Sequence, residues 1–183
     1  MPSRSRQELS TRLTDFDELI EARDAICPDG AGRPAKRRGA AVVRSSVVLL
    51  AASFEAYVEE VYESAVDLLF AAAPPADRKK LKDDTSGRLN NATVFKVNRL
   101  FFNIGIPWIM HNQRVRWQKF TNQSVRDALD GMVNARNSIA HGEVISVRKP
   151  TAVRWRGFVE RLADRIDSIV GDHVHQQTGI AHW

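Results

Sequence analysis

Apolar residues recur at helical spacing along most of the chain. From Gln7 to Ile26 they fall mostly three or four positions apart, which is typical of an amphipathic helix. Cys27-Pro28-Asp29-Gly30 ends this segment, because proline disfavours helical geometry at the residue before it and Asp-Gly favours a turn. The longest stripe runs from about Val42 to Ala72, and Pro74-Pro75 stops it. We expect a long helix in each segment.

Three more stripes predict helices further along the chain. One covers Arg88 to Phe102. Another begins near Ser124, a candidate cap with Asp127 three residues on, and reaches about Ala140 before a terminating Gly142. The last follows a candidate cap at Thr151 and reaches about Val170.

Two segments show no such stripe. Asp77 to Asp84 is a polar, lysine-rich connector with at most a short turn of helix, and residues 103–120 fit no regular element. No strand-like alternation persists anywhere, and no internal repeat is present. The sequence therefore predicts an all-α fold, a bundle of four to five helices.

The length of 183 residues fits one domain. We expect residues 1–39 to form an N-terminal helix and a basic linker, the linker running from Ala31 to Gly39, and residues 40–183 to form the helical domain. The basic stretch 31–44 contains glycine and proline and is interpreted as a flexible basic linker or a solvated face.

Composition narrows the functional classes. A single cysteine, Cys27, excludes an internal disulfide framework and a multi-cysteine zinc site. The longest apolar run, around Val47 to Ala52, is far shorter than the roughly 18 to 20 residues of a membrane span. The N-terminus does not resemble a signal peptide. We expect a soluble, cytoplasmic protein with no membrane partner, no metal and no cofactor.

The chain is basic, with a formal net charge of +5 and twenty arginines against seven lysines. Such an excess attracts polyanions without selecting one kind. Two clusters carry much of it: Arg33, Lys36, Arg37, Arg38 and Arg44, and then Arg154, Arg156, Arg161 and Arg165. Taken alone, each cluster is interpreted as a solvated face or a flexible basic linker.

The helix predicted from Val125 to Ala140 carries one residue out of pattern. On a helical wheel, Arg136 falls in the middle of the apolar arc. A guanidinium there is costly unless an anion pairs with it or the face opens onto a cleft that binds a ligand. Glu55, at the edge of the second helix's apolar stripe, is the acid we expect to pair with Arg136 or to orient a histidine.

A histidine follows at the end of the same helix. His141 can take or give a proton near neutral pH, and Arg136 can hold a phosphate and stabilise charge on its oxygens. Asn137 can orient either group by hydrogen bonds. Together these residues suit RNA cleavage by the substrate's own 2′-hydroxyl, which requires no metal.

The segment Arg136-Asn137-Ser138-Ile139-Ala140-His141 resembles the Arg-Asn-x-x-x-His motif of the HEPN superfamily of helical ribonucleases. Its surroundings, Ala52 to Tyr57 and Leu129 to Val133, resemble the RiboL-PSP-like branch, and the resemblance covers roughly Val42 to Val174. It implies a bundle that dimerises, so that the arginine and histidine of both subunits share one cleft. It also implies metal-independent endoribonuclease activity, often that of a toxin or phage-defence effector, with RNA, a second copy and an antitoxin or regulatory protein as partners.

The sequence is also compatible with other interpretations. A non-catalytic module that binds RNA or nucleotides would bind in a salt-sensitive way and release no product. A helical DNA-binding regulator is a third class, although no helix-turn-helix pattern is present. His173-Val174-His175 is interpreted as a frayed polar tail and not as a metal site. Trp108, Trp117 and Trp155 could stack bases, but core or dimer packing is favoured.

Overall fold

The computed structural model describes residues 1–85, 89–118 and 120–183. These residues form six α-helices and two 3-10 turns, with no strand longer than an isolated bridge. The elements are α1 (Arg4–Ile26), α2 (Arg33–Leu69), α3 (Pro75–Thr85), α4 (Val94–Phe102), η2 (Ile109–His111), η3 (Gln113–Val115), α5 (Asn122–Ala140) and α6 (Lys149–Thr178). The all-α prediction is confirmed. The helix beyond the expected five is α3, which occupies the segment taken as a connector.

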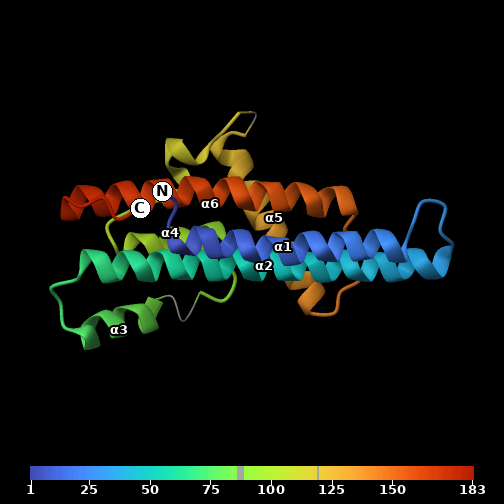
Figure 1. Ribbon diagram of the computed structural model, residues 1–183, viewed down its shortest axis with the longest axis horizontal. Coiled ribbons are helices and arrows are strands. Elements are labelled where there is room, and N and C mark those ends of the chain that lie inside the picture. The colour runs from blue at the N-terminus through green and yellow to red at the C-terminus, as the bar shows by residue number, and fades with distance from the viewer. Residues whose placement is uncertain (86–88, 119) are drawn as a thin grey trace.

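Three long helices dominate the arrangement. In Figure 1, α1 and α2 lie side by side as a hairpin, and α6 runs along them. The α1 stripe Leu9, Leu13 and Phe16 is buried in one core with the α2 stripe and with apolar residues of α6. The α1–α2 hairpin therefore belongs to the bundle and does not hang from it.

The basic linker is a helix. After the turn that begins at Cys27, α2 starts at Arg33 with Pro34 in its first turn, where a proline costs no hydrogen bond. The expected unit boundary at residue 39 therefore falls inside α2. Gly39 is buried there, and a Cβ at this position would lie 2.8 Å from the Cβ of Cys27. The glycine that looked like a linker residue lets α2 pass close to the end of α1.

The last helix starts earlier and ends later than its stripe predicts. Its N-cap is Arg148, and Pro150 lies in the first turn, so Thr151 does not cap it. It continues to Thr178 and stops at Gly179, whose φ of 73° is left-handed. The histidines at 173 and 175 are therefore helical and not a frayed tail. The His173 Nε2 atom lies 2.8 Å from the carbonyl oxygen of Ile104.

The α4 helix is shorter than predicted. Its expected start at Arg88 lies outside the described residues. In the described part, Thr93 caps the helix by accepting a hydrogen bond from the Lys96 N–H, while Asn90 and Asn91 have positive φ values of 29° and 82°. Asparagine tolerates this geometry better than most residues, so the Asn-Asn pair forms a turn. Residues 103–120 contain η2, η3 and a bridge between Trp117 and Phe120.

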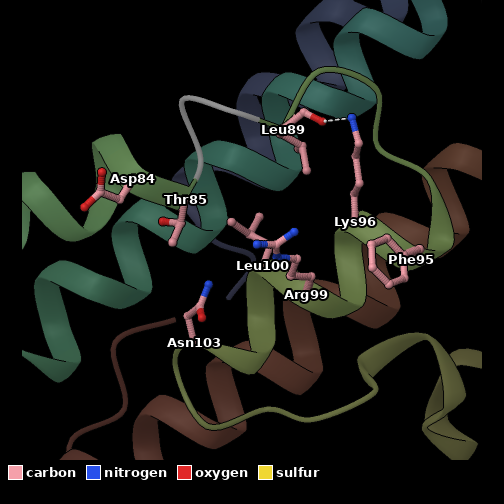
Figure 2. A pocket seen from close by; sticks show the side chains of 8 residues that line it. All are labelled: Asp84, Thr85, Leu89, Phe95, Lys96, Arg99, Leu100 and Asn103. Atoms are coloured by element: carbon pink, nitrogen blue, oxygen red, sulfur yellow. Dashed lines mark hydrogen bonds between the residues drawn. The ribbon is translucent and has the colours of Figure 1, made fainter.

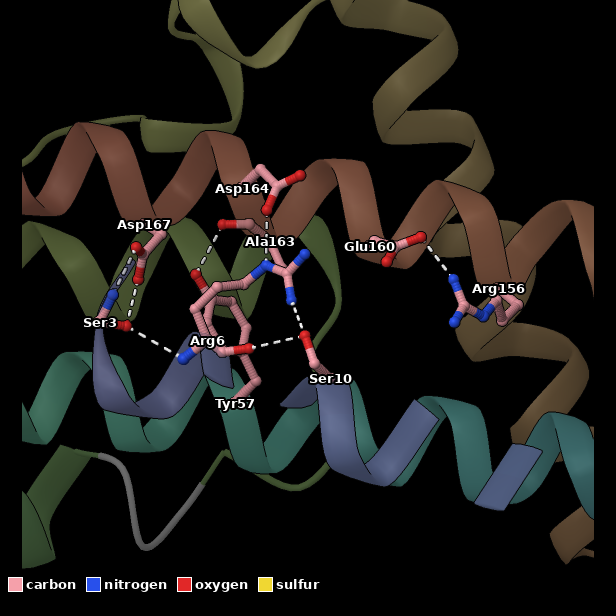
Figure 3. Close-up of polar contacts among 9 residues, drawn as sticks. All are labelled: Ser3, Arg6, Ser10, Tyr57, Arg156, Glu160, Ala163, Asp164 and Asp167. Atoms are coloured by element: carbon pink, nitrogen blue, oxygen red, sulfur yellow. Dashed lines mark hydrogen bonds and ion pairs between the residues drawn. The ribbon is translucent and has the colours of Figure 1, made fainter. Parts of the chain in front are cut away.

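A polar network ties the N-terminus to the bundle (Figure 3). Ser3 caps α1 by accepting from the Arg6 N–H, and both its backbone N–H and its hydroxyl donate to Asp167 of α6. Arg6 donates to Asp164 at 2.6 Å. The Tyr57 hydroxyl of α2 donates to the carbonyl of Ala163, and burial raises the pKa of that phenol well above its ordinary value. These bonds fix α1, α2 and α6 relative to one another.

Among the described residues, α2 is the one helix whose length and composition would allow it to cross a membrane. The expectation from apolar runs missed this, because charged residues are sparse between Val42 and Phe54 although no single run is long. Half of the apolar window is buried inside the protein, and the core helix of a bundle has the same character.

Candidate active site

The helix that carries the predicted motif is built on a regular core face. α5 begins after Thr121, whose hydroxyl accepts from the Ser124 N–H at 3.1 Å. The cap is therefore Thr121 and not Ser124, which supplies the N–H of the third helical position. Its buried residues are Val125, Leu129, Met132 and Val133. Arg136 comes next in the same row, as the wheel predicted.

Arg136 is half-buried and has no acidic partner. Its Nη1 atom donates to the side-chain oxygen of Asn91 at 2.6 Å and to that of Asn137 at 3.1 Å. Its Nε atom is buried and makes no hydrogen bond in the part of the chain that the structure describes. No ion pair involves Arg136 within those residues, so its charge is held by amide oxygens alone. A cation kept in this way retains its capacity to bind an anion.

The turn that meets Arg136 is fixed from both sides. The Asp130 carboxylate of α5 accepts the Val94 N–H at 2.9 Å, which docks the start of α4 on α5. The Lys96 ammonium donates back to the carbonyl of Leu89 at 2.8 Å (Figure 2) and also to that of Asn90. Asn91 lies between these anchors. Sequence reasoning missed Asn91, although an Asn-Asn pair ahead of a threonine cap is a turn signal.

His141 is positioned by the end of α5. Gly142 has a φ of 82°, the Gly142 N–H donates to the carbonyl of Ile139, and the Glu143 N–H donates to that of Ser138. This pair of bonds is a Schellman ending, which the glycine predicted. The imidazole is exposed and makes no hydrogen bond within the described residues. It is therefore accessible to a ligand.

Helix geometry separates Arg136 from His141 within one chain. Five residues turn the helix by about 140° and advance it by about 7.5 Å, so the two side chains leave the helix in different directions. Asn137 and His141 are four residues apart and share a face, while the Asn137 amide bonds to Arg136. The Asn137 side chain therefore contacts Arg136 and lies on the face of the helix that leads to His141.

The expected acid does not reach the arginine. Glu55 is partly buried on α2 but makes no hydrogen bond or ion pair with Arg136 or His141 in the described chain. It lies seven residues before Tyr62, hence on nearly the same face of α2. The Tyr62 ring meets Phe101 of α4 at 6.1 Å, so this face of α2 contacts α4 at Tyr62. Burial and the neighbouring glutamates Glu55, Glu63 and Glu60 raise the pKa of Glu59 to about 7.

The family model for RiboL-PSP-HEPN matches residues 8–172. The chain belongs to the RiboL-PSP-HEPN family. The match starts within α1, whereas the resemblance read from the motif began near Val42, so the α1–α2 hairpin is part of the family region. HEPN domains are associated with nuclease and RNA-related function. No curated protein and no solved structure matches the chain.

The three tryptophans considered for base stacking in this HEPN domain differ in burial. Trp117 stacks on Phe120 at 5.0 Å and packs against Phe158, and Trp155 is partly buried, as core packing predicted. Trp108 is exposed. Within the described residues, no group of three or more His, Cys, Asp or Glu side chains is arranged to hold a metal ion.

The basic clusters lie at different places on the domain. The first is on the opening turns of α2, where Arg33, Lys36 and Arg37 are exposed. In the second, Arg156 is paired with Asp17 and Glu160, while Arg154, Arg161 and Arg165 are exposed. The positive charge that the sequence predicted to be solvated is thus mostly on the surface.

Proposed function

We propose that this HEPN domain is a metal-independent endoribonuclease in which Arg136 binds the scissile phosphate and His141 transfers protons. The proposal rests on the surroundings of Arg136. Its guanidinium continues an apolar row, is held by two amide oxygens, and has a buried Nε without a partner in the described chain. An arginine with a purely structural role would be expected to meet a carboxylate there.

The proposed chemistry uses groups of the substrate and of the protein. A base removes the proton from the 2′-hydroxyl, the 2′-oxygen forms a bond to phosphorus, and the bond from phosphorus to the 5′-oxygen breaks as that oxygen receives a proton. The products are a 2′,3′-cyclic phosphate and a 5′-hydroxyl. His141 is suited to one of these proton transfers, because imidazole titrates near neutral pH. Arg136 is suited to stabilise the charge that develops on the phosphate oxygens.

The divergence of Arg136 and His141 within one helix supports a cleft shared by two subunits. In such a dimer the histidine of one copy would approach the phosphate held by the arginine of the other. Asn137 would orient the guanidinium by the hydrogen bond it already accepts. Glu55 is a candidate for orienting the imidazole, because an acid that accepts the ring N–H fixes the tautomer.

The direct test incubates the protein with mixed RNA in the presence of a chelator. His141→Ala and Arg136→Gln should each reduce cleavage by at least about 100-fold, the range for losing a proton-transfer group or a charge stabiliser. His175→Ala and Arg154→Gln are matched controls, because both residues are exposed on α6. Undiminished cleavage by the two site variants would reject the proposal, and salt-sensitive binding without product would favour a non-catalytic RNA-binding module.

A second variant separates phosphate binding from a structural role of Arg136. Asn91→Gly removes the amide that holds the guanidinium but suits the φ of 82° at that position. If Arg136 acts on the phosphate, Asn91→Gly should slow cleavage much less than Arg136→Gln does. If Arg136 serves only to hold this turn, the two variants should lose equal activity.

Mixing two inactive variants, each with a different site residue replaced, tests the shared cleft. Mixing inactive Arg136→Gln and His141→Ala chains would form some heterodimers in which one cleft has both residues intact, so activity should return. No recovery on mixing, in a preparation shown by mass to contain heterodimers, would contradict the shared cleft. If the activity is that of a toxin or defence effector, expression of the wild-type chain should arrest growth and the His141→Ala chain should not.

A further inference from the structure

An exposed aromatic groove lies along the outer face of α4. Phe95, Arg99 and Phe102 are spaced four and three residues apart and so share one face of the helix. Trp108, in the turn that follows, completes the groove, which has a volume of about 130 Å³. Phe95, Phe102 and Trp108 are 68%, 65% and 63% exposed. Soluble proteins rarely leave such a group of large aromatic side chains in water without a binding role.

The turn that carries Trp108 is held in place from below. Asn98 of α4 is buried, and its side-chain oxygen accepts the Met110 N–H at 2.9 Å. The Trp108 ring packs edge-on against His111 at 5.6 Å. Trp108 has a left-handed φ of 55°, which costs an L-residue about 1–2 kcal/mol. This strained conformation places the largest ring at the surface, so burial does not account for it.

The charge of the groove points to a polyanion. Arg99 is exposed and makes no hydrogen bond or ion pair in the described residues, and no acidic residue lines the groove there. Phe95 and Arg99 also line a second hollow of about 280 Å³, and its lining includes Thr85, Leu100 and the acidic Asp84, as Figure 2 shows. Arg99 lies between Phe95 and Phe102 in helical spacing, and its guanidinium reaches over the second hollow, as Figure 2 shows. A cation beside exposed rings matches alternating phosphates and bases, since bases stack on rings and arginine binds phosphate.

The groove lies on the helix that follows the turn binding Arg136. Asn91, which binds Arg136, is four residues before Phe95, and the start of α4 is docked on α5 through Asp130. From Phe95 to Phe102 the helix advances by about 10 Å. A nucleic-acid strand that follows α4 away from the turn would run along this face.

We propose that Phe95, Phe102 and Trp108 form a stacking platform for unpaired nucleobases of single-stranded RNA, with Arg99 binding the backbone between them. The inference deepens the proposed function by naming its substrate class, RNA whose bases are free to splay. A duplex keeps its bases stacked inside and presents only phosphates, so it cannot use the rings.

The test measures binding without cleavage. The probe is a 5′-labelled 2′-O-methyl oligouridine of about ten nucleotides, which lacks the attacking hydroxyl, and its affinity is measured by anisotropy. Phe95→Leu and Phe102→Leu keep apolar bulk but remove the ring, and each should weaken binding roughly tenfold, within the range for one stacked base. Phe70→Leu is the control, because Phe70 is an exposed phenylalanine at the end of α2. A duplex of the same length should bind equally to all four proteins.

Trp108 reports the contact directly. The single strand should quench its emission, and Trp108→Phe should abolish this quenching while it keeps most of the affinity, because phenylalanine retains a stacking ring. Equal affinity of the ring variants and the wild type would overturn the platform. A loss of the dimer mass in the ring variants, together with unchanged affinity for the probe, would also overturn the platform, because a second copy of the chain would then cover the groove.

The result is separable from the nuclease proposal. If the probe binds with the predicted ring dependence but RNA is not cut, the platform stands and the nuclease assignment fails. If RNA is cut and the ring variants bind and cleave like the wild type, the platform fails and the nuclease assignment stands.

Discussion

Two glycines, one inside α5 and one just beyond its end, should respond to alanine in opposite directions. Gly131 lies inside α5 with helical geometry, and Gly142 follows the helix with a φ of 82°. A Cβ added at either position would meet no heavy atom within 4 Å. Steric contact is therefore absent in both cases, and only the backbone conformation distinguishes them.

The magnitudes follow from that difference. At Gly131, alanine restricts the unfolded chain and favours the helix, which should raise the free energy of unfolding by about 0.5–1 kcal/mol. At Gly142, alanine must adopt a left-handed conformation, which costs about 1–2 kcal/mol. The two variants should differ by about 2 kcal/mol, or roughly 4–8 °C in melting temperature for a chain of this size.

Urea denaturation followed by far-UV circular dichroism measures both variants. Gly142→Asn is the control, because asparagine adopts the left-handed conformation more readily and should lose less stability than alanine. If Gly142→Ala were as stable as the wild type, or if both alanine variants shifted in the same direction, the Schellman ending of α5 would not be the conformation that holds the helix end. Gly142→Ala should also lower RNA cleavage more than Gly131→Ala, because His141 directly precedes the strained residue.

Three further predictions concern stability elsewhere in the domain. Folding raises the pKa of Glu59, so the folded state binds protons more readily than the unfolded state. The free energy of unfolding should therefore fall as pH rises from 4.5 to about 7. Glu59→Gln should flatten that loss, as measured by urea midpoints across this pH window. Ser3→Ala removes the α1 cap and one bond to Asp167, and should cost about 1–2 kcal/mol of unfolding free energy in the same assay. Trp108→Gly should stay within about 0.5 kcal/mol of the wild type, because relief of the left-handed backbone offsets the added freedom of the unfolded chain, and a larger loss would show that the ring stabilises the fold.

The sequence predicted the helices whose stripes are continuous, and it failed where polar composition hid a helix. The stripe of α2 gave the helix but not its start, since the basic residues from Arg33 onward have no apolar period of their own. Those turns are helical because α2 packs on α1, and Gly39 permits the approach. Likewise α3 has no buried residue, so periodicity could not detect it. Tertiary packing, and not local pattern, decides such segments.

The residues of the candidate site also divide into those that spacing along one helix predicts and those that depend on tertiary packing. Arg136, Asn137 and His141 were predictable because one helix carries all three, and helix geometry fixes their relative positions from spacing alone. Asn91 was not, because its contact with Arg136 joins residues 45 positions apart through a turn whose docking depends on Asp130 and Lys96. The predicted partner Glu55 was chosen as the acid at the edge of a stripe, and that criterion contains no information about the approach of α2 to α5.

The contact that replaced the predicted one changes what Arg136 can do. A carboxylate partner would neutralise the guanidinium and leave little reason for an anion to bind. Amide oxygens fix its direction and leave its charge uncompensated, and the buried Nε retains an unused donor. The same turn that supplies Asn91 leads into α4, whose outer face carries the exposed rings. Arg136→Lys therefore tests this arrangement, because lysine keeps the charge but cannot offer a planar fork of donors to a phosphate. Cleavage should fall nearly as far as in Arg136→Gln. Near-normal activity of Arg136→Lys would mean that charge alone suffices.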